Sequence, residues 1–351
     1  MDRSNNKFPP IAKPAFIGDF GTQYSPYRIV PGRSKLRYFY EKALKEDIKR
    51  DLKDGFYLFI TKPEVDEKLD GLLNYILLMS EPKSNLRKIV HEADFVTWRG
   101  TLTRVGSSPY DTVDSSTGWK IACVKFHGVI FLCEYATDLK RMKAATENEF
   151  QRIQTFGGFK LEQWLTTENK GEQPNTSVPV STCENYSAVF KLEIGDKRAG
   201  NHVGIFMGAE VDGIGEDGRF IEIKSQFKAI GNGRFWPSKE MKWWLQSFLA
   251  GVERLIVGIK DANSYVRTVK ELKNSEFVRS RSGGWDPAVC INTILTYLNE
   301  VRQRLNAVPE GTIILTEQIP QKPWTIKELS LSEDRLAYDF LLPKFIHHFN
   351  L

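Results

Sequence analysis

Two short segments near the middle of the chain combine residue types that can bind metal ions and cleave phosphate esters. In an extended strand alternate side chains share one face, so the two charged residues of each segment would point the same way. A glycine-rich connector separates them, which predicts an antiparallel hairpin. Three carboxylates beside one ammonium would then favour an oxygen-preferring cation, Mg²⁺ or Mn²⁺. The segments are Glu210-Val211-Asp212 and Glu222-Ile223-Lys224.

An Asp followed about ten residues later by Glu-x-Lys is the arrangement of many metal-dependent nucleases. The acids hold divalent ions, which lower the pKa of a bound water and neutralise charge on a phosphate in transfer. The lysine orients that water or a phosphate oxygen. The pattern alone is only moderately specific, because such pairs are also common on solvated strand faces. Other residues are therefore needed to distinguish a metal site from a solvated strand face.

An acid follows a pair of glycines upstream of these segments. If Gly157-Gly158 forms a tight turn after a helix, Glu162 would bring a fourth carboxylate to the same cation. The alternative is a helix that ends on a glycine cap, with Glu162 on the surface. Both interpretations place a helix end at the glycines.

Two residues could contact phosphate from other elements. Arg99 lies between Trp98 and Gly100, so its guanidinium could clamp a phosphate while the indole offers a stacking surface. The alternative is a core tryptophan beside a surface arginine. Gln246 falls on the flank of an amphipathic helix and could donate to a scissile phosphate if it faces the hairpin. Otherwise it is a surface residue.

Bulk composition is that of an ordinary globular protein. The 351 residues are 41% hydrophobic and 26% charged, and the length alone suggests two domains only as a soft prior. A net charge of +5 permits a polyanionic partner without demanding one. The four cysteines lack paired spacing, which indicates reduced thiols. The polar start and the short apolar stretches predict neither a signal peptide nor membrane passage.

Periodicity and turn residues predict an interleaved order of helices and strands, and hence an α/β fold with a mixed sheet flanked by helices. An irregular arm covers 1–35, and a surface loop covers 166–182. The predicted helices span 64–79, 139–156, 237–249 and 286–305, and the predicted strands span 95–98, 119–136, 186–192, 255–259 and 312–316.

In their order and spacing these motifs resemble the decapping exoribonuclease family of the DXO type. The resemblance extends from about residue 20 to at least 316, and several ordered motifs are more specific than any one. It rests on the two acidic segments, on Trp98-Arg99-Gly100 and Gly158 to Glu162, on Lys242 to Leu249, and on Trp285 to Asn292.

The resemblance implies one domain over 1–351 with two mixed or antiparallel β-sheets flanked by helices. It implies a hydrolase that removes incomplete caps, triphosphates or an NAD cap from RNA 5′ ends, with 5′ to 3′ digestion as a further activity. Two Mg²⁺ or Mn²⁺ ions would be held by Glu162, Glu210, Asp212, Glu222 and the carbonyl of Ile223. The implied contacts to the phosphate or water are Lys224 and Gln246, and those to the RNA are Trp98, Arg99, Gly100, Glu67 and Ser187.

Two other functions stay open on the sequence. One is a non-enzymatic RNA-binding adaptor that stabilises a separate 5′ to 3′ exonuclease, and the other is a DNA nuclease. The expected state is a monomer in the nucleus, with the cytoplasm as the alternative compartment.

Overall fold

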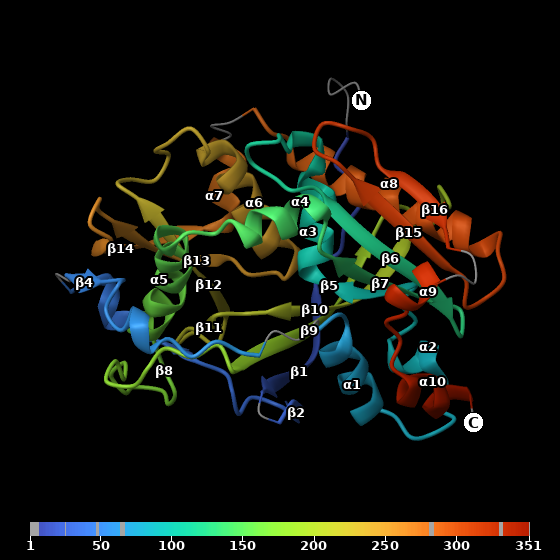
Figure 1. The fold of residues 1–351 in the computed structure, drawn as a ribbon, viewed down its shortest axis with the longest axis horizontal. Helices are drawn as coiled ribbons and strands as arrows, with labels where there is room; N and C mark the ends of the chain where they lie inside the picture. Colours follow the sequence, from blue (N-terminus) through green and yellow to red (C-terminus); the bar gives the residue numbers. More distant parts are fainter. Residues whose placement is uncertain are drawn as a thin grey trace.

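Two β-sheets meet side by side in the computed structural model, with helices packed around them (Figure 1). The structure describes residues 7–24, 26–46, 49–63, 67–280, 284–329 and 333–350. Within these residues the larger sheet has nine strands in the order β16-β15-β6-β7-β5-β10-β9-β1-β2, and the smaller has seven in the order β4-β14-β13-β12-β11-β3-β8. The prediction of a mixed α/β fold with two sheets is confirmed.

The larger sheet takes strands from every third of the chain. Most neighbours are antiparallel, but β5 runs parallel to both β7 and β10. The bounds are β1 Ala15–Gln23, β2 Arg28–Pro31, β5 Phe95–Trp98, β6 Trp119–Phe126, β7 Val129–Tyr135, β9 Glu184–Ile194, β10 Val203–Glu210, β15 Ile313–Gln318 and β16 Thr325–Glu328.

The smaller sheet is built around β12, which pairs parallel with β13 and antiparallel with the short β11. Its bounds are β3 Tyr38–Phe39, β4 Arg50–Asp51, β8 Thr166–Thr167, β11 Gly213–Ile214, β12 Phe220–Phe227, β13 Arg254–Lys260 and β14 Tyr265–Lys273.

Helices cover both faces of the larger sheet, and α6 and α5 lie on opposite faces of the smaller sheet. Apolar side chains of α3, α6 and α8 share a core with one face of the larger sheet, while α1 and α10 pack on its other face. Helix α5 packs on the smaller sheet. The bounds are α1 Asp70–Leu78, α2 Leu86–Ile89, α3 Arg99–Ser107, α4 Asp138–Ala145, α5 Glu149–Leu165, α6 Trp236–Leu249, α7 Asn274–Ser280, α8 Pro287–Asn306, α9 Glu333–Ala337 and α10 Pro343–Asn350, with 3-10 turns at Glu41–Leu44, Phe56–Leu58 and Ser108–Tyr110.

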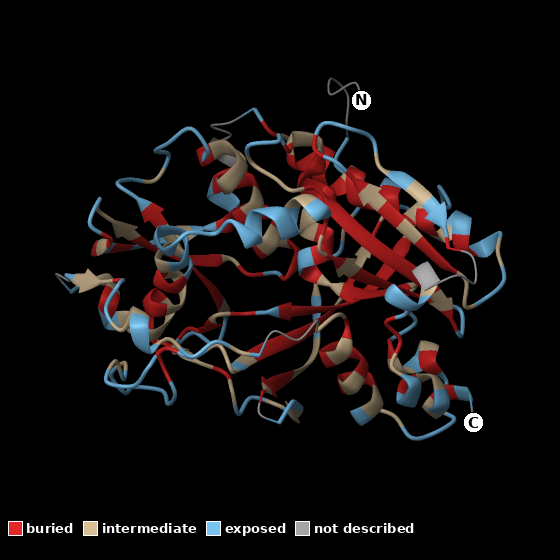
Figure 2. Cartoon of the chain, in the orientation of Figure 1, coloured by how far each residue is buried: buried red, intermediate tan, exposed pale blue. Residues whose placement is uncertain are grey.

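Strands β6 and β7 are buried along almost their whole length, as Figure 2 shows, because helices cover both of their faces. By contrast, α4 has no buried residue. It crosses between the two sheets as an exposed helix (Figure 2).

Most predicted elements are found, but several predictions need correction. The single helix predicted over 139–156 is two helices, α4 and α5, and α5 continues to Leu165. The surface loop predicted over 166–182 begins with the buried strand β8. The arm at 1–35 is not irregular, since β1 pairs along its length with β9 inside the larger sheet. The helix predicted from 64 starts only at Asp70, and 64–66 lie outside the described residues. Sequence periodicity missed β14, β16, α7, α9 and α10.

Gly157-Gly158 does not end a helix, contrary to both sequence interpretations. The glycines lie inside α5, which begins at a capping box between Asn148 and Gln151. A Cβ at Gly157 would stand 3.3 Å from the Cβ of Leu52, so close packing accounts for this glycine. Glu162 therefore reaches the site from a continuous helix.

The predicted hairpin is also wrong in its first strand. Glu210 is the last residue of β10 in the larger sheet, whereas Glu222 and Lys224 lie on β12 in the smaller sheet. The hairpin present is β11 with β12, which pairs Gly213 with Ile221. The chain changes sheets at Val211 and Asp212, so the charged cluster joins two sheets.

The start of α8 agrees with its prediction and can be tested. Asp286 is the N-cap, and its Oδ1 accepts a hydrogen bond of 2.8 Å from the N–H of Ala288. We expect Asp286→Ala to lower the free energy of unfolding by about 1 kcal/mol in denaturant titration. Asp286→Asn keeps a capping oxygen and should cost clearly less. Equal losses in the two variants would contradict a capping role.

Candidate active site

The candidate site lies where the ends of strands from the two sheets meet. Parallel neighbours β5 and β10 end at the same edge of the larger sheet, with Trp98 opposite Gly208. Arg99 then opens α3, and Glu210 ends β10. From the smaller sheet β12 supplies two further residues, α5 and α6 supply one each, and one more lies between β10 and β11. The remaining members are Glu222, Lys224, Glu162, Gln246 and Asp212.

Glu222 is the centre of the hydrogen-bond network and its side chain is fully buried. Arg99 donates from Nη1 to Oε1 at 2.5 Å, and Lys224 donates from Nζ to Oε2 at 2.6 Å. Gln246 Nε2 lies 3.5 Å from the same Oε2, so it faces the cluster. Burial disfavours the charged form of Glu222, but Arg99 and Lys224 outweigh it and lower the pKa.

The other three acids carry charge that these two cations do not balance. Burial, followed by repulsion from Glu222, raises the pKa of Asp212 to about 7. Burial, followed by repulsion from Asp212 and Glu210, raises the pKa of Glu162 well above its usual range. The pKa of Glu210 is raised as well, because neighbouring protein atoms exclude part of the water around its carboxylate, although the residue as a whole is exposed. The cluster therefore holds more negative charge than its protein partners neutralise.

A divalent cation fits this donor set by chemistry. The donors are carboxylate oxygens, which suit Mg²⁺ or Mn²⁺, and a cation would offset the excess charge. Within the described residues, however, no three acidic, imidazole or thiol side chains converge into a ready coordination sphere. The carboxylates turn to protein donors instead; Asp212 Oδ2, for example, accepts the N–H of Ile223 at 2.6 Å. Such a contact uses one lone pair of the carboxylate and leaves the others available to an ion.

The residues predicted to contact RNA differ in how accessible they are. A Cβ at Gly208 would clash with the ring of Trp98, and the indole N–H is donated to the carbonyl of Lys68 at 3.1 Å, so Trp98 is packed into the fold. A Cβ at Gly100 would meet nothing, which leaves open space beside Arg99. Ser187 is buried on β9 directly opposite Glu210.

Glu67 lies at the same end of the site, within a group that sequence reasoning missed. It accepts a hydrogen bond from the Tyr24 hydroxyl and an ion pair of 2.8 Å from Lys62. Both Lys62 and Glu67 act on the charge of Glu210. No periodic signal marks Tyr24 or Lys62, because they come from irregular segments that tertiary contacts bring together.

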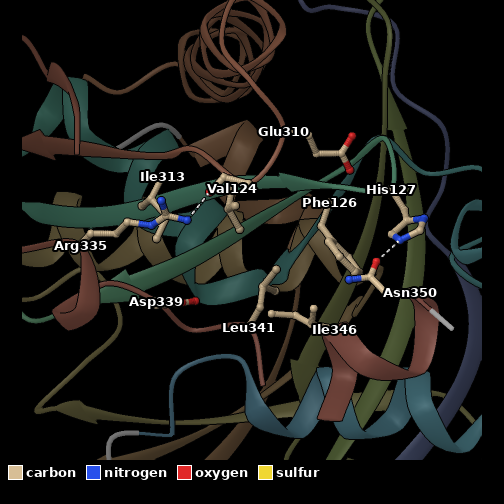
Figure 3. Close-up of a pocket in the computed structure, with 11 residues that line it drawn as sticks. Val124, Phe126, His127, Glu310, Ile313, Arg335, Asp339, Leu341, Ile346 and Asn350 are labelled. Atoms are coloured by element: carbon tan, nitrogen blue, oxygen red, sulfur yellow. Dashed lines mark hydrogen bonds between the residues drawn. The ribbon is translucent and has the colours of Figure 1, made fainter. Parts of the chain in front are cut away.

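A separate hollow of about 370 Å³ lies at the other end of the larger sheet and contains none of the predicted site residues. Figure 3 shows His127 hydrogen-bonded to Asn350 on one side of it and Arg335 on the other. The β6–β7 turn and the C-terminal helices form it, so it is remote from the carboxylates on β10 and β12. This hollow therefore does not mark the candidate active site.

The raised acidic pKa values predict how the metal-free protein responds to pH. The pKa of Asp212 is about 7 in the folded chain and 3.8 ordinarily. Protonated Asp212 therefore contributes stability that is fully present below pH 3.8 and is lost as the pH rises through 7. In chelator, the melting temperature of Asp212→Asn relative to wild type should therefore increase between pH 4 and pH 8. A difference that stays constant with pH would contradict the shift.

Sequence comparison places the chain among known proteins. Residues 12–345 match the family model described as RAI1-like PD-(D/E)XK nuclease. The decapping nuclease dom-3 of Caenorhabditis elegans is 34% identical over 301 residues, which cover 84% of this chain and 75% of that protein. The decapping and exoribonuclease protein of Bos taurus is 29% identical, over 79% of this chain and 71% of that protein.

Solved structures share the fold at lower identity. Rai1 of Scheffersomyces stipitis in complex with (3′-NADP)⁺ and calcium ion has a TM-score of 0.78 and 17% identity, covering 98% of this chain and 96% of that chain. Rai1 of Candida albicans in complex with pU5-Mn²⁺ has a TM-score of 0.75 and 20% identity, covering 98% of both chains.

Proposed function

This chain belongs to the RAI1-like PD-(D/E)XK nuclease family, and on that premise we propose that it is a divalent-metal-dependent hydrolase of RNA 5′ ends. It would remove incomplete caps, a triphosphate or an NAD cap, with 5′ to 3′ exoribonuclease digestion as a further step. The observation that carries the proposal is the convergence on one buried carboxylate of a guanidinium, an ammonium and an amide, beside three more acids.

The acids would hold one or two divalent ions, Mg²⁺ or Mn²⁺. Such an ion, when bound, lowers the pKa of a bound water and neutralises charge on a phosphate. The proposed ligands come from α5, β10 and β12 and the connection between the sheets: Glu162, Glu210, Asp212, Glu222 and the carbonyl of Ile223.

Lys224 and Gln246 would act on the reacting group. The Lys224 ammonium contacts Glu222 with one of its three N–H donors, so it can also donate to a phosphate oxygen or the attacking water. Gln246, which lies on α6, would donate a hydrogen bond from its side-chain amide to the scissile phosphate. Neither needs a change of protonation to do so.

The 5′ region of the RNA would lie on the side of the larger sheet. Arg99 keeps further N–H groups besides the one given to Glu222, and the open space at Gly100 leaves room for a nucleotide. Trp98 would position Arg99 from the core. Glu67 and Ser187 would line the same end of the pocket. Structures of relatives that hold (3′-NADP)⁺ or pU5 in their complexes support an RNA end as substrate.

A panel of RNAs that differ only at the 5′ end tests the proposal. The protein is incubated with 5′-triphosphate, cap-bearing and NAD-capped RNA in Mn²⁺, and products are separated by size and charge. We expect release of the end group from at least one of them, and none in chelator. A folded protein that processes no RNA end would overturn the proposal, while faster cleavage of a matching 5′-phosphorylated DNA would favour a DNA nuclease.

A binding-only adaptor is the second candidate, because the Arg99 guanidinium and the open space at Gly100 could hold an RNA end without cleaving it. The adaptor would bind RNA or a separate 5′ to 3′ exonuclease and stabilise it. It predicts RNA turnover only when the exonuclease is present, with Asp212→Ala changing nothing.

We further propose that residues 1–351 form one domain that acts as a monomer in the nucleus, with the cytoplasm as the alternative. Family similarity over residues 12–345 supports a single unit. Among the described residues no helix combines the length and apolar character needed to cross a membrane.

A further inference from the structure

Lys62 is a lysine at the Arg99 end of the candidate active site, and its ammonium lies near the surface. Its Nζ forms an ion pair of 2.8 Å with Glu67 Oε1, and the Tyr24 hydroxyl donates to the same oxygen. The ammonium also stands 5.4 Å from the centre of the Tyr24 ring. The Lys62 side chain is 41% exposed, so a ligand from solvent can reach it.

The partner of Lys62 is fixed to the element that carries Arg99. Glu67 directly precedes Lys68, whose carbonyl accepts the indole N–H of Trp98 at 3.1 Å. Trp98 is in turn the N-cap residue of α3, which Arg99 opens. Direct contacts and peptide bonds therefore join Lys62 to Arg99.

The ring of Trp98 also places this ion pair beside the end of β10. A Cβ at Gly71 on α1 would stand 3.3 Å from the ring, and a Cβ at Gly208 on β10 would clash with it. Because α1 follows the ion pair directly and Glu210 lies two residues beyond Gly208, the ion pair and this carboxylate lie close together. Burial raises the pKa of Glu210, and the charge of Lys62 is the largest influence that lowers it.

Backbone contacts hold Lys62 in place independently of its ion pair. The N–H of Lys62 donates to Thr182 Oγ1 at 2.9 Å, and the N–H of Thr182 donates to the carbonyl of Ile60 at 3.0 Å. These hydrogen bonds tie the segment to the residues that lead into β9. The Lys62 side chain can therefore leave Glu67 while its backbone stays where it is.

The ion pair itself is easily exchanged. An ion pair this exposed adds little stability, because water screens both charges. If Lys62 turned away, Glu67 would keep the Tyr24 hydroxyl as a donor. The contact with Glu67 uses one of the three N–H donors of the ammonium, so the others can bind an anion. Lys62 thus has the position, the exposure and the donors to bind a charged part of a substrate.

We propose that Lys62 binds a phosphate of the 5′ end group of the RNA, on the 5′ side of the scissile phosphate. The assignment rests on the proposed function, which places the 5′ region of the RNA on the Arg99 side. Incomplete caps, a triphosphate and an NAD cap all carry linked phosphates, so a cation at this end favours them over a 5′-hydroxyl end. When the phosphate binds, the ammonium exchanges Glu67 for a phosphate oxygen.

Binding of two RNAs that differ only at the 5′ end tests this role without relying on turnover. Decamers with a 5′-triphosphate or a 5′-hydroxyl, labelled at the 3′ end, are titrated in Mg²⁺ with the Asp212→Asn protein, alone and with Lys62→Met. We expect the parent protein to bind the triphosphate RNA more tightly. Lys62→Met should reduce this preference about tenfold, the effect of one charge-assisted contact, and leave the affinity for the hydroxyl RNA within about twofold.

Glu67→Gln distinguishes direct phosphate binding from a lysine that only positions Glu67. If Lys62 binds the phosphate, Glu67→Gln removes the competing carboxylate and should preserve or raise the preference for the triphosphate RNA. If Lys62 only orients Glu67, both substitutions should reduce the preference, and the proposal is wrong.

Two control variants separate this effect from general loss of charge or fold. Lys62→Arg keeps the cation and should retain most of the preference. Lys344→Met removes an exposed lysine on α10, at the other end of the larger sheet, and should change neither affinity. Thermal melting of every variant checks folding.

An unchanged preference in folded Lys62→Met overturns the assignment. Equal weakening of both RNAs overturns it too, because the lysine would then bind the body of the RNA. If the wild-type protein hydrolyses RNA ends in either case, the proposed function stands and only the role of Lys62 fails.

Discussion

Replacing Asp212 by asparagine should reduce hydrolysis of a susceptible RNA 5′ end by about 1000-fold or more, since a bound cation contributes several kcal/mol to phosphate cleavage. Asp212 lies at the point where the chain passes from one sheet to the other. Its amide replacement is similar in size and can still accept the N–H of Ile223, so the fold should survive. What is lost is one negative charge facing Glu162 and Glu222.

The matched control is Glu216→Gln, which makes the same acid-to-amide change at an exposed residue a few positions away in the β11–β12 turn. It should leave the rate within about twofold, as expected for a surface substitution away from the site. RNA binding by Asp212→Asn, measured by anisotropy, should persist. An Asp212→Asn protein with near-normal turnover would contradict the assignment of this carboxylate to the reaction.

Residue types and local spacing were sufficient to predict much of this site. The apolar spacing of α6 fixes which side is buried, and that leaves Gln246 on the flank, where it faces Glu222. Alternation along β12 likewise predicts that Glu222 and Lys224 share a face, and the two are in contact. These inferences succeed because they depend on one element at a time.

The failures concern how separate elements come together. Alternation in Glu210-Val211-Asp212 is the same whether its neighbour is β12 or β9, so the sequence does not reveal that the chain changes sheets there. The two glycines of α5 look like a helix end until Leu52, from a distant segment, is seen to pack against Gly157. Burial of Arg99 against Glu222 is a contact between the two sheets that spacing along the chain does not reveal.

That buried contact predicts a large loss of stability. The side chains of Arg99 and Glu222 are 7% and 0% exposed, so removing the guanidinium leaves a carboxylate inside the protein with Lys224 as its one charged partner in direct contact among the described residues. We expect Arg99→Met to lower the free energy of unfolding by about 3–5 kcal/mol in chelator, as for other buried ion pairs that lose one member. Denaturant titration measures it.

Two comparisons identify the unpaired buried charge as the cause. Adding Glu222→Gln to Arg99→Met removes that charge, so the double variant should regain more than half of the loss. Arg104 lies on the same helix as Arg99, and Arg104→Met breaks its ion pair of 2.6 Å with Glu134 on β7. Because the Arg104 side chain is 40% exposed, this loss should cost below about 1 kcal/mol. A loss of stability in Arg99→Met no larger than that in Arg104→Met would contradict this account. Glu222 would then have found another partner, and its charge at the junction of the two sheets would not depend on Arg99.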